Sequence, residues 1–157
     1  VKRIGLSNAQ GPELDIALEI LGGPNDGGVV SIQNEYSPRY RGEQDVLDKC
    51  MKLGIAFLPW SPLGGAAQAG EVGSRYSDFA SVATEVGATA QEVVLAWLLA
   101  LTPVMIPIPG ATKPATVDSI IRASALKLTS AQVDRLTAAD SPNESLFPDL
   151  KPRSPLR

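Results

Sequence analysis

The chain has 157 residues, of which 44% are hydrophobic and 20% charged, enough for one globular unit with its own core. Its formal net charge of −3 argues against a general binder of nucleic acid or of anionic membranes, because such proteins carry a basic surplus. It has no histidine and one cysteine, Cys50, which excludes histidine general bases, zinc sites with the usual ligands and internal disulfides.

Strands and helices then alternate along the chain. In order, we expect a strand at residues 2–6, a helix from Pro12, a strand at Val29–Gln33, a helix at about 43–53 and a strand at 55–60. Two helices at 77–86 and 90–100, a strand at 104–108, a helix from Pro114 and a short helix from Thr129 follow. Residues 1–140 are thus regular, and residues 141–157, with four prolines, predict an extended tail.

Local signals mark several helix ends and faces. Gly54 and Gly87 suit the left-handed residue that ends a helix, and Thr89 begins a capping box. Helical spacing places Met51 on a buried side, and it predicts one buried face on the helix after Pro114, made of Val117, Ile120, Ile121 and Ser124.

Four strand–helix alternations require parallel strands joined by right-handed crossovers, so the fold class is α/β. In such folds, functional residues gather at the carboxyl ends of the strands. Side-chain amides at two of these ends, Asn8 and Gln33, suit a planar carboxamide, and Trp60 offers a flat face to an aromatic ring. Taken singly, each of these residues is better explained by turn capping or core packing.

The start of the helix at Pro114 predicts a second type of site. Unpaired backbone N–H groups would lie there beside the Thr112 hydroxyl and the Lys113 ammonium, which together favour an anion such as a phosphate. A plain turn with a surface lysine is the simpler explanation of these residues alone.

Four motifs occur in a fixed order: Gly5-Leu6-Ser7-Asn8, Gln33-Asn34-Glu35-Tyr36-Ser37-Pro38, Trp60-Ser61-Pro62-Leu63-Gly64, and the stretch from Ile106 to Lys113. In this order they closely resemble the C-terminal half of the aldo-keto reductase family, over residues 1–140. The resemblance implies a (β/α)8 TIM-type barrel of which this chain supplies four βα units, strands 5–8, as a half barrel.

The resemblance also implies an NADP(H) site. Ser7, Asn8 and Gln33 would hold the nicotinamide carboxamide, and Trp60, where tyrosine is more usual, would stack on the ring. The pyrophosphate would lie along Ser61, Pro62, Leu63 and Gly64, and the adenosine 2′-phosphate near Gly110, Thr112 and Lys113. Thr112 replaces a residue that is often basic, and Thr116 replaces another contact residue, so NAD(H) remains an alternative.

The family reduces aldehydes and ketones with a tetrad of Asp, Tyr, Lys and His that lies on the first four strands. This chain lacks those strands, so we assign it no catalytic residue and expect it to be inactive alone. The strands at 2–6 and 104–108 would be unpaired, with apolar inner faces exposed. A missing N-terminal half would cover them, or a second copy of the chain.

Two alternatives remain open at this point. One is a non-catalytic NADP(H)-binding or regulatory module, and the other is a sugar-phosphate isomerase or aldolase barrel that binds its substrate's phosphate near Lys113. The second leaves Asn8, Gln33 and Trp60 unexplained. The sequence contains no membrane span of roughly 20 apolar residues and no signal-peptide pattern, so we expect a cytoplasmic location. Because Val1 already falls in a strand pattern, we also expect a longer natural chain.

Overall fold

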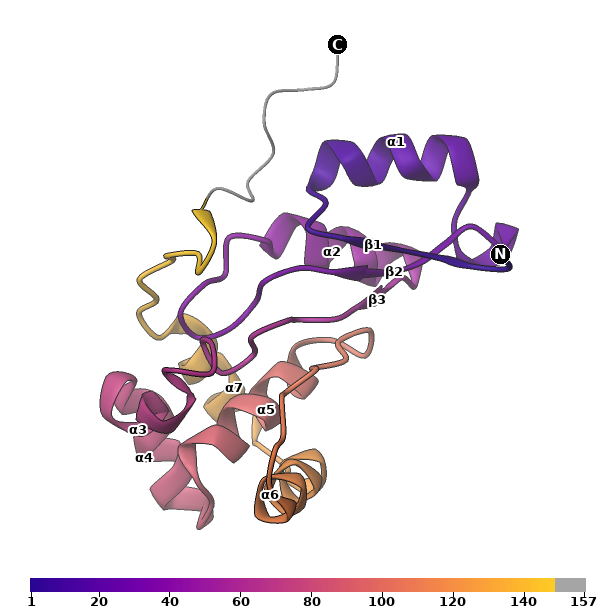
Figure 1. Ribbon diagram of the computed structural model, residues 1–157. Helices are drawn as coiled ribbons and strands as arrows, with labels where there is room; N and C mark the ends of the chain where they lie inside the picture. Colours follow the sequence, from indigo (N-terminus) through magenta and orange to yellow (C-terminus); the bar gives the residue numbers. More distant parts are fainter. Residues whose placement is uncertain (149–157) are drawn as a thin grey trace.

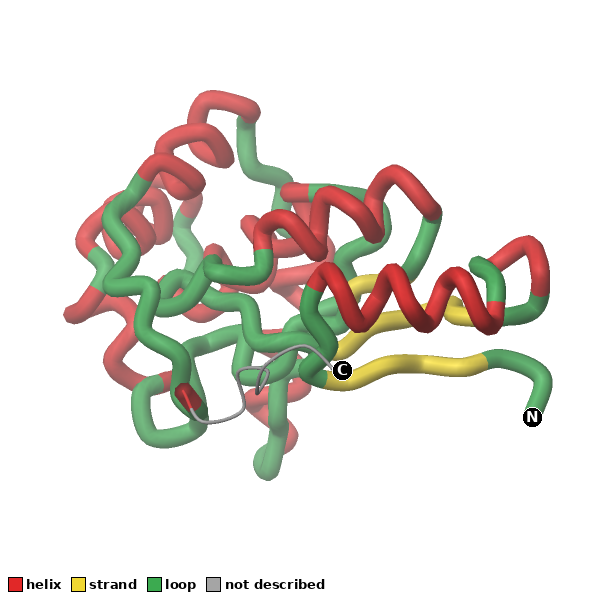
Figure 2. Tube along the Cα trace, turned by 90° about the horizontal axis from the view of Figure 1, so that it is seen from above, coloured by secondary structure: helices red, strands yellow, loops and turns green. Residues whose placement is uncertain are grey.

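The computed structural model describes residues 1–148 and contains a small parallel sheet (Figures 1 and 2). Its strands are β1 (Ile4–Ser7), β2 (Val29–Gln33) and β3 (Ala56–Phe57), in the order β1-β2-β3. The helices are α1 (Gly11–Leu21), α2 (Gln44–Leu53), α3 (Val72–Arg75), α4 (Ser77–Val86), α5 (Ala90–Leu101), α6 (Pro114–Ala125) and α7 (Ser130–Ala138), with single 3₁₀ turns at Pro24–Asp26 and Ala69–Glu71. Figure 1 shows α1 beside β1 and the helices from α3 onward gathered beyond β3.

The fourth expected strand, at residues 104–108, is not a strand among the described residues. It forms only one isolated bridge, between Met105 and Phe57 of β3. Its backbone nevertheless runs along β3: the Phe57 N–H donates to the Val104 carbonyl, and the Ile106 N–H donates to the Phe57 carbonyl, both at 2.8 Å. The Ile108 N–H continues the pattern by donating to the Pro59 carbonyl at 3.4 Å, but Pro59 has no N–H to donate in return, so the ladder is incomplete here. The four-strand expectation is therefore corrected to three strands with a parallel fourth segment.

The two outer edges of this arrangement differ in character. Residues Gly5, Ser31 and Ala56 are register partners across the sheet, so one face of the sheet carries a row of small residues rather than the apolar face that we expected at β1. On the other edge, Ile106 and Ile108 are 50% and 37% exposed, and the apolar surface predicted there is present.

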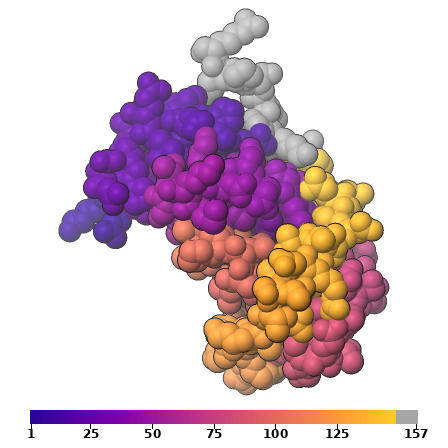
Figure 3. Space-filling view, turned by 180° about the vertical axis from the view of Figure 1, so that it is seen from behind, coloured from indigo at the N-terminus to yellow at the C-terminus, as the bar shows by residue number. Residues whose placement is uncertain are grey.

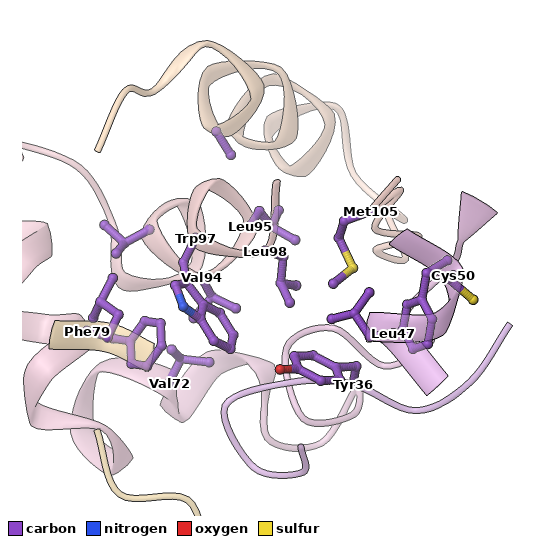
Figure 4. Packing of buried hydrophobic residues seen from close by; sticks show 14 of the residues in the cluster. Tyr36, Leu47, Cys50, Val72, Phe79, Val94, Leu95, Trp97, Leu98 and Met105 are labelled. Atoms are coloured by element: carbon purple, nitrogen blue, oxygen red, sulfur yellow. The ribbon is translucent and has the colours of Figure 1, made fainter. Parts of the chain in front are cut away.

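The core lies between the sheet and the C-terminal helices and is centred on Trp97 of α5 (Figure 4). Its ring stacks on Tyr36 at 6.2 Å and meets Phe79 edge-on at 5.4 Å between centroids. The indole N–H of Trp97 donates to Thr137 of α7 at 3.0 Å. These contacts join the segment after β2 to α4, α5 and α7.

Most of the predicted helix ends agree with the structure. Gly54 and Gly87 adopt the left-handed conformation after α2 and α4, and Thr89 and Glu92 form the expected capping box of α5. Two predictions of burial are wrong. Met51 is 49% exposed, although the rest of the predicted α2 face, Val46, Leu47 and Cys50, is buried. Helix α6 leaves Val117 and Ile121 46% and 60% exposed, with Ser124 exposed and Ile120 half-buried.

The described part of the chain has no single helix that is long and apolar enough to cross a membrane. Helices α4 and α5 reach that length and composition only together, and they are bent by 95° at the break between them. Residues 141–147 of the predicted tail have no helix or strand, and its residues 149–157 lie outside the described part.

Candidate functional site

The carboxyl ends of the three strands meet at one edge of the sheet. The backbone N–H of Asn8 donates to the carbonyl of Gln33, and the N–H of Trp60 donates to the carbonyl of Asn34, both at 3.0 Å. These bonds align the strand exits side by side. The side chains of Ser7, Asn8, Gln33 and Trp60 therefore line one cavity of about 230 Å³, together with Phe147 from the C-terminal segment.

Hydrogen bonds fix some of the polar groups in this cavity and leave others available. The indole N–H of Trp60 donates to Oδ1 of Asn8 at 2.9 Å, which orients the Asn8 amide. The Ser7 hydroxyl donates to the Gln33 carbonyl at 3.3 Å. The side-chain amides of Gln33 and, at Nδ2, of Asn8 have no partner among the described residues. A ligand with both an acceptor and a donor, such as a carboxamide, can therefore bind these amides.

Two non-glycine residues at these exits have a positive φ. Asn8 has φ = 52° and Ser61 has φ = 50°. Left-handed backbone is uncommon for non-glycine residues, although asparagine tolerates it better than most, and such residues are frequent at ligand sites. The turn at Asn8 directs its amide across the strand ends toward Trp60.

A second and larger cavity, of about 850 Å³, begins at the residue after Trp60. It is lined by Ser61, Pro62, Leu63, Gly65, Ala66, Ala69, Gly70, Ile108, Pro109, Gly110, Ala111, Thr112, Lys113 and Thr116. Seven of the predicted site residues thus face one groove, and consecutive residues, Trp60 and Ser61, border the two cavities.

Gly64 is the one predicted site residue that lines neither cavity. It is buried in the turn after β3, with φ = 80°, and its N–H donates to the Ser61 carbonyl at 2.8 Å. Its role here is to form the turn that shapes the groove, since a residue with a side chain would be strained at this φ.

The far end of the groove is the start of α6. Lys113 is the N-cap residue, and Pro114 occupies the first turn, where no N–H is needed. The Lys113 side chain is exposed and makes no cap hydrogen bond. The positive end of the helix dipole and the Lys113 ammonium therefore both favour an anion at this position.

The tyrosines of the chain are poorly suited to proton transfer at neutral pH. Burial raises the pKa of Tyr36 to about 12. Burial and the adjoining Glu43 carboxylate raise the pKa of Tyr40 to about 12, and burial also raises the pKa of Tyr76. A phenol that protonates a substrate works best with a lowered pKa. The raised pKa values are compatible with our assignment of no catalytic residue to this chain, which stays a prediction.

Within residues 1–148, no group of three or more His, Cys, Asp or Glu side chains could hold a metal ion. The sequence reasoning did miss two residues at the smaller cavity. Phe147 lines it, and the buried carboxylate of Glu35 accepts from the Leu146 N–H next to it. The only sequence signal for Phe147 was an isolated aromatic residue in a proline-rich tail, whereas Glu35 lies within the motif that begins at Gln33.

The chain is similar to known proteins in sequence and in fold. The family description "Aldo/keto reductase family" matches residues 1–141. The pyridoxine 4-dehydrogenase of Escherichia coli is 34% identical over 129 residues, which cover 82% of this chain and 41% of that protein. The chain spans 32% to 43% of the length of the curated relatives it matches.

Two solved structures have the same fold. An aldo-keto reductase from a Medee basin deep-sea metagenome library has a TM-score of 0.80 at 18% identity, covering 96% of this chain and 52% of that one. The Bombyx mori aldo-keto reductase, solved in complex with NADP, has a TM-score of 0.74 at 22% identity, covering 90% of this chain and 45% of that one.

Proposed function

The chain belongs to the aldo/keto reductase family, and we propose that it carries the cofactor-binding half of an NADP(H)-dependent reductase of aldehydes and ketones. One observation supports this most: the predicted ring-binding residues line one cavity, the predicted phosphate-binding residues other than Gly64 line another, and the consecutive residues Trp60 and Ser61 border one cavity each. A dinucleotide is a ligand with an aromatic carboxamide at one end and phosphates at the other, so its two ends match the two cavities.

The nicotinamide end is assigned to the smaller cavity. Nδ2 of Asn8 and the Gln33 amide would bind the carboxamide, with the Ser7 hydroxyl beside them. The exposed face of Trp60 would stack on the ring. The cavity volume of about 230 Å³ is sufficient for a nicotinamide ring.

The phosphate end is assigned to the larger cavity. The turn from Ser61 to Gly64 would follow the pyrophosphate, and Gly110 to Lys113 would approach the adenosine 2′-phosphate. A relative from Bombyx mori is solved with NADP, which supports this cofactor class. The preference for NADP(H) over NAD(H) depends mainly on Lys113, because Thr112 and Thr116 are uncharged.

When bound, the cofactor would supply the hydride for carbonyl reduction. The residues of this chain would bind and orient it, while the proton-donating residues would come from a partner. We propose that the three strands and the parallel segment at 104–108 form half of a (β/α)8 barrel, which an N-terminal half completes. The exposed Ile106 and Ile108 and the single pairing partner of β1 support an incomplete sheet.

Closure by a second copy of the chain is the alternative to an N-terminal half. Light scattering distinguishes them, since only self-closure gives a stable dimer of the isolated chain. A folded monomer of 16.5 kDa that neither dimerises nor binds a separately expressed N-terminal half would contradict the need for either partner. The substrate class follows from the family, and the name of the Escherichia coli relative makes pyridoxal a reasonable first carbonyl to assay in the completed enzyme.

The first test is direct binding of cofactor to the chain. Calorimetric titration with NADPH should show one site, and Lys113→Ala should weaken NADPH binding about tenfold while changing NADH binding less than about twofold. Lys127→Ala, an exposed lysine beyond the end of α6, is the matched control and should change neither. Absence of saturable binding of both dinucleotides would overturn the proposal.

A non-catalytic NADP(H)-binding or regulatory module remains the second candidate. The raised pKa values of Tyr36, Tyr40 and Tyr76 favour it for this chain taken alone. Turnover by the chain combined with an N-terminal half would select the reductase, and binding without turnover in that complex would select the module.

A further inference from the structure

Residues 141–147, here called the C-terminal strap, lie along the segment that follows β2. Figure 3 shows this region, in yellow, against the purple surface of the first third of the chain. Three hydrogen bonds attach its residues 141–144: Ser141 Oγ donates to the Arg39 carbonyl at 3.0 Å, the Arg41 N–H donates to Asn143 Oδ1 at 3.0 Å, and Arg39 Nε donates to the Glu144 carbonyl at 2.9 Å. The strap is therefore an ordered part of the fold at the site.

Glu35 holds the end of the strap. Its residue is only 4% exposed, and its carboxylate accepts from the Ser145 hydroxyl at 2.6 Å and from the Leu146 N–H at 3.0 and 3.1 Å to its two oxygens. Hydrogen bonds to a buried carboxylate are stronger than those between neutral groups. These bonds fix Ser145 and Leu146, the two residues before Phe147. Glu35 therefore determines where the Phe147 ring lies.

Phe147 meets Trp60 at a corner of the smaller cavity. The two ring centroids are 5.7 Å apart and the ring planes are inclined at 54°. A ring inserted between two parallel aromatic rings needs roughly 7 Å between them, about twice a normal carbon contact distance. The separation of 5.7 Å is therefore too small for a ring to lie between Trp60 and Phe147. A ring that stacks on Trp60 must lie on the part of the indole face that Phe147 leaves open. Because Trp60 and Phe147 line the same cavity, a heterocycle stacked on the rest of the Trp60 face would lie beside the Phe147 ring, and edge-to-face contacts of this kind are favourable.

We propose that Phe147 is a second aromatic wall of the ring-binding cavity, and that Glu35 is the residue that positions it. The ligand class is a planar carboxamide heterocycle such as nicotinamide. The inference rests on the proposed function, because it assigns the same cavity to the nicotinamide end. Phe147 limits how far the ring can slide along Trp60, and so it fixes the position of the reactive carbon.

Fragments of the cofactor test this directly. Binding of reduced nicotinamide mononucleotide reports on the smaller cavity, and binding of 2′,5′-ADP reports on the groove at Lys113. Phe147→Ala should weaken the mononucleotide roughly three- to tenfold and leave 2′,5′-ADP within about twofold. Glu35→Gln, which keeps the shape of the side chain but removes its charge, should show the same selective loss of mononucleotide affinity while the chain stays folded by circular dichroism.

Glu144→Gln is the control within the strap. Its carboxylate pairs with Arg39 but is 69% exposed, so its loss should change neither affinity. Equal or tighter mononucleotide binding by Phe147→Ala would overturn the inference, and equal loss of both fragments would assign Phe147 a merely structural role and overturn it too. If Phe147→Ala is selective but Glu35→Gln is not, the positioning role of Glu35 is wrong. A wild-type chain that binds neither fragment would overturn the proposed function together with this inference.

Discussion

The indole Nε1 of Trp60 donates a hydrogen bond to Oδ1 of Asn8 at 2.9 Å, and this bond connects the exits of β3 and β1. Because it uses the amide oxygen, it leaves the Asn8 Nδ2 donors directed elsewhere. A phenylalanine at position 60 could still offer a stacking face but has no N–H to make this bond. The bond therefore connects the residue proposed to stack on a ring with the residue proposed to bind that ring's carboxamide.

Replacing Trp60 by phenylalanine should separate these two functions. We expect Trp60→Phe to weaken binding of reduced nicotinamide mononucleotide roughly five- to tenfold, because the Asn8 amide loses the bond that orients it. Asn8→Asp keeps the acceptor for Trp60 and removes the donor for the carboxamide, so it should weaken the same ligand without breaking the internal bond. Fully additive effects in the double variant, measured by calorimetry, would show that the two residues act independently.

A buried carboxylate on α5 provides a prediction about acid stability. Glu92 is 5% exposed at its side chain and accepts from the Thr89 N–H, Ser119 Oγ and Arg122 Nε, each at 2.9 Å. Burial alone would raise the pKa of Glu92, but the hydrogen bonds from Thr89, Ser119 and Arg122 outweigh it, and the pKa lies below its ordinary value of 4.5. Its ionised form therefore stabilises the packing of α6, which carries the Lys113 groove, on α5.

Because the folded-state pKa is lowered, this stabilisation is fully present above pH 4.5 and is lost as the pH falls through the folded-state value. Glu92→Gln should lower the free energy of unfolding by about 2 kcal/mol at pH 7, and the difference from wild type should shrink below pH 4.5. Urea unfolding across this pH range measures both. Glu85→Gln removes a solvent-exposed carboxylate and is the control, with a much smaller effect expected. A loss that stays constant down to pH 3 would contradict the assignment.

The single cysteine reports on opening of the core beside β3. Cys50 is fully buried on α2, and burial raises the pKa of its thiol to about 11, with Lys49 opposing the shift slightly. At pH 8 only about one thiol in a thousand is then ionised, so alkylation by iodoacetamide should be slow in the native chain. Labelling followed by mass spectrometry should become rapid only in unfolding concentrations of urea. Fast native labelling at pH 8 would show that α2 opens readily.

The features that sequence reasoning placed correctly are those with local causes. Gly54, Gly87 and the Thr89 capping box depend on residues within one helical turn, and each has the expected geometry. The segment at 104–108 depends instead on the chain beside it, where Pro59 has no N–H to continue the ladder, so a strand pattern in its own sequence was insufficient. Helical spacing predicted the position of α6 but not which of its faces is covered.

The candidate site divides in the same way. The polar strand exits followed from the order of strands along the chain, and the structure places Ser7, Asn8, Gln33 and Trp60 around one cavity. Phe147 could not be placed there from sequence, because the bond that fixes its neighbour joins Glu35 and Leu146 across 111 residues. Contacts at such separation depend on the folded arrangement of the whole chain rather than on local pattern.

The exposed face of α6 supports a prediction about the proposed partner. Val117 and Ile121 lie one turn apart and are 46% and 60% exposed, although their spacing is typical of a buried face. If an N-terminal half covers this face, Val117→Ser and Ile121→Ser should change the stability of the isolated chain by less than about 0.5 kcal/mol. Both should weaken its association with that half, because each removes apolar area from the contact.

Val93→Ser is the matched comparison, since Val93 of α5 is fully buried and its replacement should destabilise the chain itself by about 2 kcal/mol. Urea unfolding of the isolated chain and calorimetric titration with a separately expressed N-terminal half measure the two effects. Destabilisation of the isolated chain by Ile121→Ser as large as that by Val93→Ser would show that the face is already packed. Weakened self-association with unchanged binding of the N-terminal half would instead indicate that a second copy of the chain covers α6.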